Sequence, residues 1–321
     1  MKQAQNWIEE FIPLNGTETY LLTLPAAPGK PLVLFLHGGP GVSESCFAYA
    51  HHDMLGDACT LAFYDQRGAG RTLRRNPDAP LSIGLMLHDL DGVIKLLKKR
   101  FPGSPIVLLG HSWGTVLGAL YALRHPERIA RYIGVGQVVS MTAAEQASTA
   151  ALRKALAERG TPRDQARFAS MQPYPPDHWD KKGLRHYAAM TKLRNKYGLR
   201  EPNPVPLIPA VRRSPTLQKR DLIDIIRGNL TSTPLLCACM NVFDLTRFSA
   251  HWRVPALFIQ GARDHITHLA PVERYFDRID APEKQLVVMA DCGHSPMIDR
   301  PDLFARHIRE QLAKAEKEVH Q

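Results

Sequence analysis

The chain lacks the features that mark membrane and secreted proteins. Its 321 residues contain no stretch near the roughly 18 consecutive apolar residues that a membrane-spanning helix needs. Residues 1–15 carry Glu9 and Glu10 and no apolar run of the kind found in a signal peptide. We therefore expect a soluble, cytoplasmic protein with no membrane span.

Paired metal ligands and redox cysteines are also missing. The five cysteines are irregularly spaced and form no Cys-x-x-Cys motif: Cys46, Cys59, Cys237, Cys239 and Cys292. No His-x-x-x-His pair occurs either. We predict buried free thiols, which fit a reducing compartment, and no metal site or cofactor.

Acidic residues are scarce in the middle of the chain. Residues 140–250 hold 18 Lys+Arg against 9 Asp+Glu, so most of the net charge of +10 lies there. Such a segment can attract an anionic substrate, a membrane surface or nucleic acid. No nucleic-acid-binding module accompanies it, so we expect no nucleic-acid partner and favour a solvated basic surface.

The rest of the pattern is typical of a folded α/β protein. Short runs that are apolar throughout predict strands buried on both faces, at residues 31–37, 59–64, 105–109, 131–139, 255–260 and 285–289. Helical patterns lie between or after them, at residues 82–100, 113–124, 272–279 and 301–314. This alternation predicts a mostly parallel central sheet with helices on both faces.

The middle segment interrupts the alternation. Residues 140–250 show helices and loops, many prolines and no buried strand run. We predict a mainly helical, basic cap domain at 140–250, inserted before the last strands, and a core domain formed by 1–139 and 251–321. Ligands of open α/β sheets bind at the carboxyl ends of the strands, so a cap at that end would shape the substrate pocket.

The strongest chemical signal is Gly110-His111-Ser112-Trp113-Gly114. It fits G-x-S-x-G, the strand-to-helix turn that exposes a nucleophilic serine, and a predicted strand and helix flank it. Glycines on either side remove Cβ atoms that would clash at so sharp a turn. The pattern therefore predicts Ser112 as a nucleophile.

A second signal follows the first predicted strand, at His37-Gly38-Gly39-Pro40-Gly41. An acyl-transfer enzyme needs N–H donors aimed at the developing oxyanion. We predict that the amides of Gly39 and Trp113 form this oxyanion hole. A tight Gly/Pro turn alone would explain the glycines but not their pairing with the serine motif.

Three motifs together resemble the proline iminopeptidases, which are serine α/β-hydrolases. They are His37–Gly41 (HGGPG), Tyr64–Thr72 (YDQRGAGRT) and Gly110–Gly114 (GHSWG), and the resemblance covers about residues 20–139 and 252–312. It implies the α/β-hydrolase fold and a triad in the chain order Ser, Asp, His. It also implies release of an N-terminal residue, typically proline, from peptides, although some esterases share the motifs.

The remaining triad members follow from this resemblance. His294 comes after the last apolar strand and before the terminal helix, as the family's histidine does, whereas His51 and His52 are expected at the surface. Asp264 ends a strand where the resemblance places the acid, and we prefer it to Asp291 and Asp244. A serine hydroxyl needs such a base and a carboxylate that orients it.

Two neighbouring motifs receive structural interpretations. Residues 65–70 (DQRGAG) fail the dinucleotide pattern because Leu73 replaces its third glycine, so we expect a buried ionic turn that braces the oxyanion loop. His265 and His268 flank the proposed acid and are expected to be solvated or to line the pocket.

The substrate is left between two classes. The resemblance predicts an iminopeptidase acting on short peptides, through an acyl-enzyme. In that family the cap supplies glutamates for the substrate amine, but this cap has only Glu145, Glu158 and Glu201, plus six aspartates, in no matching motif. The alternative is a carboxylesterase or lactonase acting on a small neutral or anionic ester. A non-hydrolytic use of the fold, as receptor or lyase, is a third hypothesis, and the oligomeric state stays open.

Overall fold

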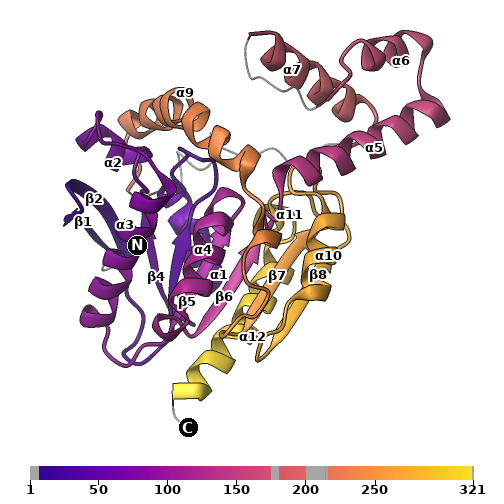
Figure 1. Cartoon of the computed structure of the whole chain (residues 1–321). Helices are drawn as coiled ribbons and strands as arrows, with labels where there is room; N and C mark the ends of the chain where they lie inside the picture. Colours follow the sequence, from indigo (N-terminus) through magenta and orange to yellow (C-terminus); the bar gives the residue numbers. More distant parts are fainter. Residues whose placement is uncertain (1–6, 175–180, 200–213, 215, 320–321) are drawn as a thin grey trace.

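The computed structural model describes residues 7–174, 181–199, 214 and 216–319 (Figure 1). Its centre is an eight-stranded sheet in the order β1-β2-β4-β3-β5-β6-β7-β8. The strands are β1 Ile8–Leu14, β2 Thr17–Leu24, β3 Leu32–Leu36, β4 Thr60–Tyr64, β5 Ile106–His111, β6 Arg131–Val135, β7 Ala256–Gly261 and β8 Lys284–Met289. From β4 to β8 all neighbours are parallel, while β1 and β2 are antiparallel additions.

Helices follow or connect these strands. The α-helices are α1 Ala48–Leu55, α2 Gly70–Arg75, α3 Ile83–Arg100, α4 Trp113–Arg124, α5 Met141–Arg159, α6 Pro162–Ala169, α7 Lys181–Lys196, α9 Lys219–Val242, α10 Leu269–Arg278, α11 Pro296–Asp299 and α12 Pro301–Val319. Short 3-10 turns are η1 Ser45–Phe47, η2 Pro126–Arg128 and η3 Leu245–Arg247. The predicted α/β-hydrolase fold is confirmed.

Strands β3 to β7 are buried throughout because helices cover both faces of the sheet there. Every residue of β3 is buried. Leu32, Leu34 and Leu36 join one core cluster, with side chains of α3, α4 and α10, while Val33 and Phe35 join the other, with side chains of α1 and α12. Alternate residues of a strand point to opposite faces, which explains why these runs lack a polar alternation.

Three details differ from the sequence expectations. The strand predicted over 285–289 was expected to be buried on both faces, but β8 lies at the edge of the sheet and only Met289 in it is buried. The β1–β2 hairpin was not predicted, although its turn, Asn15-Gly16, has the positive φ angles (46° and 79°) that such a dipeptide favours. The strand expected over 131–139 ends at Val135, because Gly136 adopts a φ of 57° and turns the chain out of the sheet.

The chain between β6 and β7 forms α5, α6, α7 and α9. Figure 1 shows α9 lying against the body near α2, whereas α6 and α7 stand away from it at the far end of α5. We call α6, α7 and the end of α5 next to them the far lobe. The far lobe has its own apolar cluster, formed by Leu152, Ala155, Leu156, Phe168, Met171, Tyr174, Met190, Leu193 and Tyr197.

Three cysteines agree with the expectation of buried free thiols: Cys46, Cys59 and Cys292. Cys239 is free but only half-buried, and the side chain of Cys237 lies outside the description. Within the residues that the structure describes, no helix is both long and apolar enough to cross a membrane.

Candidate active site

Ser112 occupies the turn between β5 and α4. Its φ of 52° and ψ of −118° lie in a region that non-glycine residues rarely adopt, at a cost of about 1–3 kcal/mol. A Cβ on Gly114 would overlap the carbonyl oxygen of Leu36, and one on Gly110 would lie 2.7 Å from the carbonyl oxygen of Gly114. The two glycines therefore allow α4 to start directly against the sheet, with Ser112 held at its N-terminus.

The glycine loop after β3 packs against this turn. A Cβ on Gly38 would lie 3.4 Å from the Cβ of Ser112. Gly39 has a φ of 114°, and a Cβ added at this position would lie 2.8 Å from the amide nitrogens of Gly41 and Val42. Trp113 is the first residue of α4, whose leading amides have no acceptor inside the helix. Both predicted oxyanion donors thus belong to segments that adjoin Ser112.

Gln66 ties these two segments together, a role that sequence reasoning missed. Its backbone amide donates to Nε2 of His37 (3.0 Å), and its side-chain amide donates to the carbonyl oxygen of His37 (3.1 Å). Its Oε1 accepts from the indole N–H of Trp113 at 2.9 Å. The side chain is buried, so it fixes the distance between the glycine loop and the start of α4.

The rest of the 65–70 turn is ionic and buried, as expected. Arg67 makes a two-pronged contact with Asp89, at 2.9 and 3.0 Å, and both side chains are 2% exposed. Asp65 accepts from Ser43, Ser45 and the amide of Arg71. Burial raises the pKa of Asp65, although these donors and His37 oppose the shift.

His294 reaches the site from the loop after β8. Its Nδ1 lies 2.9 Å from Oδ2 of Asp264, which follows β7. A Cβ on Gly136 would lie 3.1 Å from Nδ1 of His294, so the ring rests against the residue that follows Val135. The carbonyl oxygen of Val135 accepts from the amide of Ser112 at 2.9 Å. Asp264 and His294 are therefore in direct contact, and Ser112, after β5, binds the end of β6, the strand that lies between β5 and β7.

Asp264 is held by several donors. Its Oδ1 accepts from the amides of Ile266 and Thr267, both at 2.9 Å, and its Oδ2 accepts from the Thr267 hydroxyl at 2.7 Å. Burial acts to raise the pKa of Asp264, but the nearby charge of His294 and the hydrogen bonds from His294 and Thr267 outweigh it, so the pKa is lowered. The carboxylate is therefore the stable form beside His294.

The competing acids lie elsewhere. Asp291 is exposed and pairs with Arg263 at 2.9 Å. Asp244 accepts from the amide and hydroxyl of Thr246 and begins η3.

The expectation for His51 was wrong. His51 is 5% exposed, and its ring packs on Phe35 and Phe63. Burial lowers its pKa to about 4. Residue type gave no hint, because the side chain points inward from α1.

The histidine pair beside the acid is half-buried, and its two rings pack edge to face with centroids 5.8 Å apart. His268 accepts from the amide of Ala270 at 3.2 Å and begins α10. Burial, followed by the charge of His268, lowers the pKa of His265 to about 4. Among the described residues, no group of three or more His, Cys, Asp or Glu side chains is arranged to hold a metal ion.

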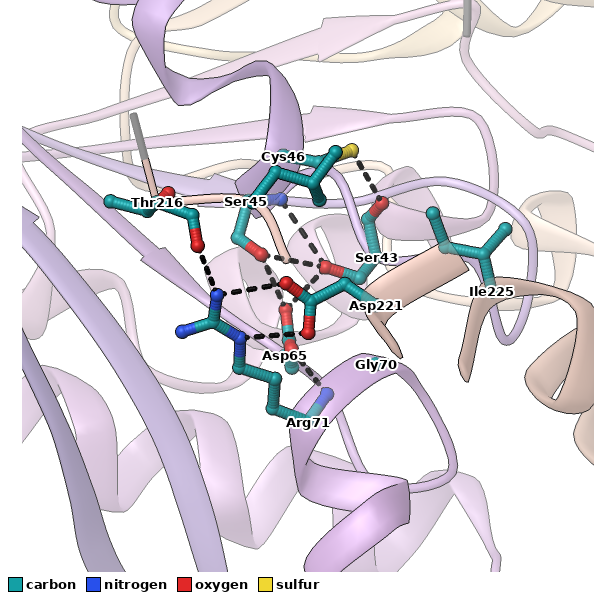
Figure 2. A pocket seen from close by; sticks show the side chains of 10 residues that line it. Ser43, Ser45, Cys46, Asp65, Gly70, Arg71, Thr216, Asp221 and Ile225 are labelled. Carbon is teal, nitrogen blue, oxygen red and sulfur yellow. Dashed lines mark hydrogen bonds and ion pairs between the residues drawn. The ribbon is translucent and has the colours of Figure 1, made fainter. Parts of the chain in front are cut away.

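A small polar cavity lies beside the glycine loop, between it and α9 (Figure 2). Its volume of about 10 Å³ holds roughly one water molecule. Arg71 crosses it to Asp221, at 2.9 Å, and to the carbonyl oxygen of Thr216. Because its polar groups already bind one another, this cavity is a seam between α9 and the core rather than a substrate site.

Helix α9 is fastened to the same loop. The Thr233 hydroxyl donates to the carbonyl oxygen of Pro40, and the Ser232 hydroxyl donates to that of Gly68, both at 2.6 Å. A Cβ on Gly228 would overlap the carbonyl oxygen of Gly41. The backbone of α9 thus touches the loop that carries Gly39.

Comparison with known proteins identifies the family. The family model described as the alpha/beta hydrolase fold matches residues 31–301. The probable aminopeptidase YbaC of Bacillus subtilis is 25% identical over 317 residues, which span 95% of this chain and 97% of that protein. A probable proline iminopeptidase of Streptomyces coelicolor is 35% identical over 124 residues, or 38% of this chain and 37% of that protein.

Among solved structures, the proline iminopeptidase of Mycobacterium smegmatis superposes with a TM-score of 0.68 at 20% identity, covering 97% of this chain and all of that one. The match supports the fold. Together with the family match over most of the chain, it shows that this protein is a hydrolase of the α/β-hydrolase-fold family, with relatives named as proline iminopeptidases and aminopeptidases.

Proposed function

We propose that the protein is a serine hydrolase that works through an acyl-enzyme, with Ser112 as nucleophile, His294 as base and Asp264 as the orienting acid. The observation that carries this proposal is the contact of 2.9 Å between His294 and a buried Asp264, beside a serine held at a φ of 52°. An acceptor at Nδ1 leaves Nε2 of His294 to take the serine proton.

The steps follow from these roles. Ser112 attacks the substrate carbonyl while His294 takes its proton, and the amides of Gly39 and Trp113 stabilise the oxyanion. The leaving group then takes the proton from His294. Water, activated by His294, attacks the acyl-enzyme and releases the acid. No cofactor enters these steps.

We further propose that residues 140–250 act as the cap and that the first substrate class is a short peptide with a free N-terminus. The similarity to an aminopeptidase over nearly the whole chain supports this class. An aminopeptidase must hold the charged substrate amine, and a carboxylate is the natural partner for it.

One observation favours the ester alternative. Each acidic side chain that the structure describes in residues 140–250 already has a partner: Glu145 with Arg194, Glu158 with Lys154, Asp164 with Lys196, Asp221 and Asp224 with Arg71 and Arg74, and Asp244 with Thr246. Asp177, Asp180 and Glu201 lie outside the described residues. A basic cap whose described carboxylates are all paired suits a neutral or anionic ester.

The two classes are separated by matched substrates. Proline β-naphthylamide, its N-acetylated form and p-nitrophenyl butyrate should be assayed in parallel, with Ser112→Ala as the control. Faster turnover of the free-amine substrate than of its acetylated form supports the peptidase. Strong turnover of the butyrate with none of the naphthylamide identifies an esterase. Turnover that survives Ser112→Ala refutes the nucleophile.

A further inference from the structure

A chain of polar contacts runs behind the Ser112 turn, separate from the contact between Asp264 and His294. Nδ1 of His111 lies 2.9 Å from Oε1 of Glu44, and its Nε2 lies 3.0 Å from the main-chain carbonyl oxygen of His294. The side chains of His111 and Glu44 are only 10% and 16% exposed. The residue that precedes the nucleophile thus joins the loop after β3 to the backbone of the proposed base.

The partners determine where the protons of His111 lie. A carbonyl oxygen only accepts hydrogen bonds, so Nε2 of His111 must donate to His294. Nδ1 then donates to Glu44 if Glu44 is ionised, or accepts from Glu44 if it is protonated. Burial acts to raise the pKa of Glu44, but His111, followed by His37 and His51, outweighs it, and the pKa is lowered. An ionised Glu44 requires both nitrogens of His111 to carry protons.

The other histidines that face Glu44 do not supply the balancing charge. His37 accepts at Nε2 from the amide of Gln66 and donates from Nδ1 to the carbonyl oxygen of Gly38, so it is neutral. His51 has a pKa of about 4, lowered by burial, and is neutral near pH 7. A buried carboxylate needs a cation beside it. His111 is the histidine in direct contact.

We propose that Glu44 and the His111 imidazolium form a buried ion pair that positions His294, with Nδ1–H donating to Glu44 and Nε2–H donating to the carbonyl oxygen of His294. This proposal rests on the proposed function, because it assumes that His294 is the catalytic base. Asp264 fixes the ring of His294 and His111 fixes its main chain. The contact with His111 thus adds a main-chain anchor to those that Asp264 and Thr267 give the ring of His294. His111 is a positioning residue and touches no substrate.

The first test compares two amide replacements of His111. The side-chain N–H of His111→Gln lies near the place of Nε2 and can still donate to His294, whereas the shorter His111→Asn can reach only Glu44. We expect kcat of His111→Asn to fall about 10- to 100-fold with KM within about twofold of wild type. His111→Gln should restore kcat to within about fivefold of wild type.

The second test measures the protonation of His111 in the wild type and in two variants of Glu44. In protein labelled with ¹⁵N-histidine, both ring nitrogens of His111 should carry protons while Glu44 is ionised. Glu44→Gln should leave only Nε2 protonated, because the new amide can donate to Nδ1, and should keep kcat within about fivefold of wild type. Glu44→Leu should lower kcat as His111→Asn does.

The outcomes separate this inference from the proposed function. A neutral His111 in the wild type overturns the ion pair, and equal kcat values for His111→Asn and wild type overturn the positioning role. In either case Ser112→Ala would still abolish turnover and the proposed function would stand. If the wild type turns over none of the esters and amides and a fluorophosphonate fails to label Ser112, the proposed function itself fails.

Discussion

Asp264 has more hydrogen-bond donors than a simple ion pair would need. In addition to the contacts with His294 and Thr267, Oδ2 of Asp264 accepts a hydrogen bond from the side-chain amide of Gln260 at 2.9 Å. Asp264→Asn would preserve the shape but present an N–H where His294 needs an acceptor, and the imidazole would turn or take the other tautomer. We expect kcat to fall by roughly three to four orders of magnitude, measured with p-nitrophenyl butyrate.

The neighbouring acid supplies the control for this prediction. Asp291 is close to His294 in sequence but is exposed and paired with Arg263. Asp291→Asn should change kcat by less than about twofold. A large loss in Asp291→Asn together with a small one in Asp264→Asn would reverse the assignment.

His51 makes the protein sensitive to acid. Its pKa falls from the ordinary histidine value of 6.5 to about 4 on folding, because burial disfavours the charged ring. Between these values the unfolded chain binds a proton that the folded chain does not, so stability decreases as the pH falls from about 6.5 to 4. The loss reaches up to roughly 3 kcal/mol and then levels off.

His51→Leu should remove this part of the pH dependence. Urea unfolding at pH 7 and pH 4.5 would show a smaller difference in unfolding free energy than the wild type shows. His88→Leu, on the exposed side of α3, should keep the wild-type difference. An unchanged difference in His51→Leu would mean that other groups cause the acid sensitivity.

At the residue scale, the sequence predicts a functional residue where a local motif indicates both the residue type and its place between a strand and a helix. The turn around Ser112 and the segment around His294 are of that kind. The supporting side chains are not. Gln66, Glu44 and His51 act through neighbours more than ten residues away in the chain. No local sequence pattern predicts these contacts, because they form only when distant segments pack together.

Helix α9 is the element that links the middle segment to the oxyanion loop. Gly228 lies where any side chain would overlap the carbonyl oxygen of Gly41. Gly228→Ala should push the loop, displace the amide of Gly39 and lower kcat at least about tenfold, in the p-nitrophenyl butyrate assay. The melting temperature should fall as well.

Gly84 offers a matched control for this change. It lies in the first turn of α3, and a Cβ there would meet nothing closer than Ser82 at 3.9 Å. Gly84→Ala should keep kcat and raise stability by about 0.5–1 kcal/mol. Wild-type kcat in Gly228→Ala would show that the loop does not depend on α9.

The helices and strands that the sequence predicted are those with a regular pattern of apolar residues. Strand β3 is apolar at every position, β5 is apolar over its first four residues, and α3 repeats its apolar residues at helical spacing. The β1 strand was missed because it is largely exposed, with Pro13 and two glutamates in seven residues. Its only strong local signal is the Asn15-Gly16 turn.

Positive charge is distributed unevenly over the whole molecule. The helices between β6 and β7 carry most of the excess positive charge, and they stand at the end of the sheet where Ser112 lies (Figure 1). An anionic substrate approaching that end should be attracted over about one Debye length. We expect kcat/KM for p-nitrophenyl hydrogen succinate to fall several-fold between 20 and 500 mM NaCl.

The neutral butyrate ester is the reference for this measurement, because screening should leave its kcat/KM nearly unchanged. Equal salt responses of the two esters would mean that the basic helices do not guide the substrate.

The helices α5, α6 and α7 share an apolar cluster of their own, so this part of the protein can change independently of the core. Its members lie between Leu152 and Tyr197, and none belongs to the two clusters that line the sheet. The far lobe can therefore be transplanted from a relative as one module, joined through α5, without repacking the interior that carries Ser112. Such chimaeras would exchange selectivity while the chemistry is inherited unchanged.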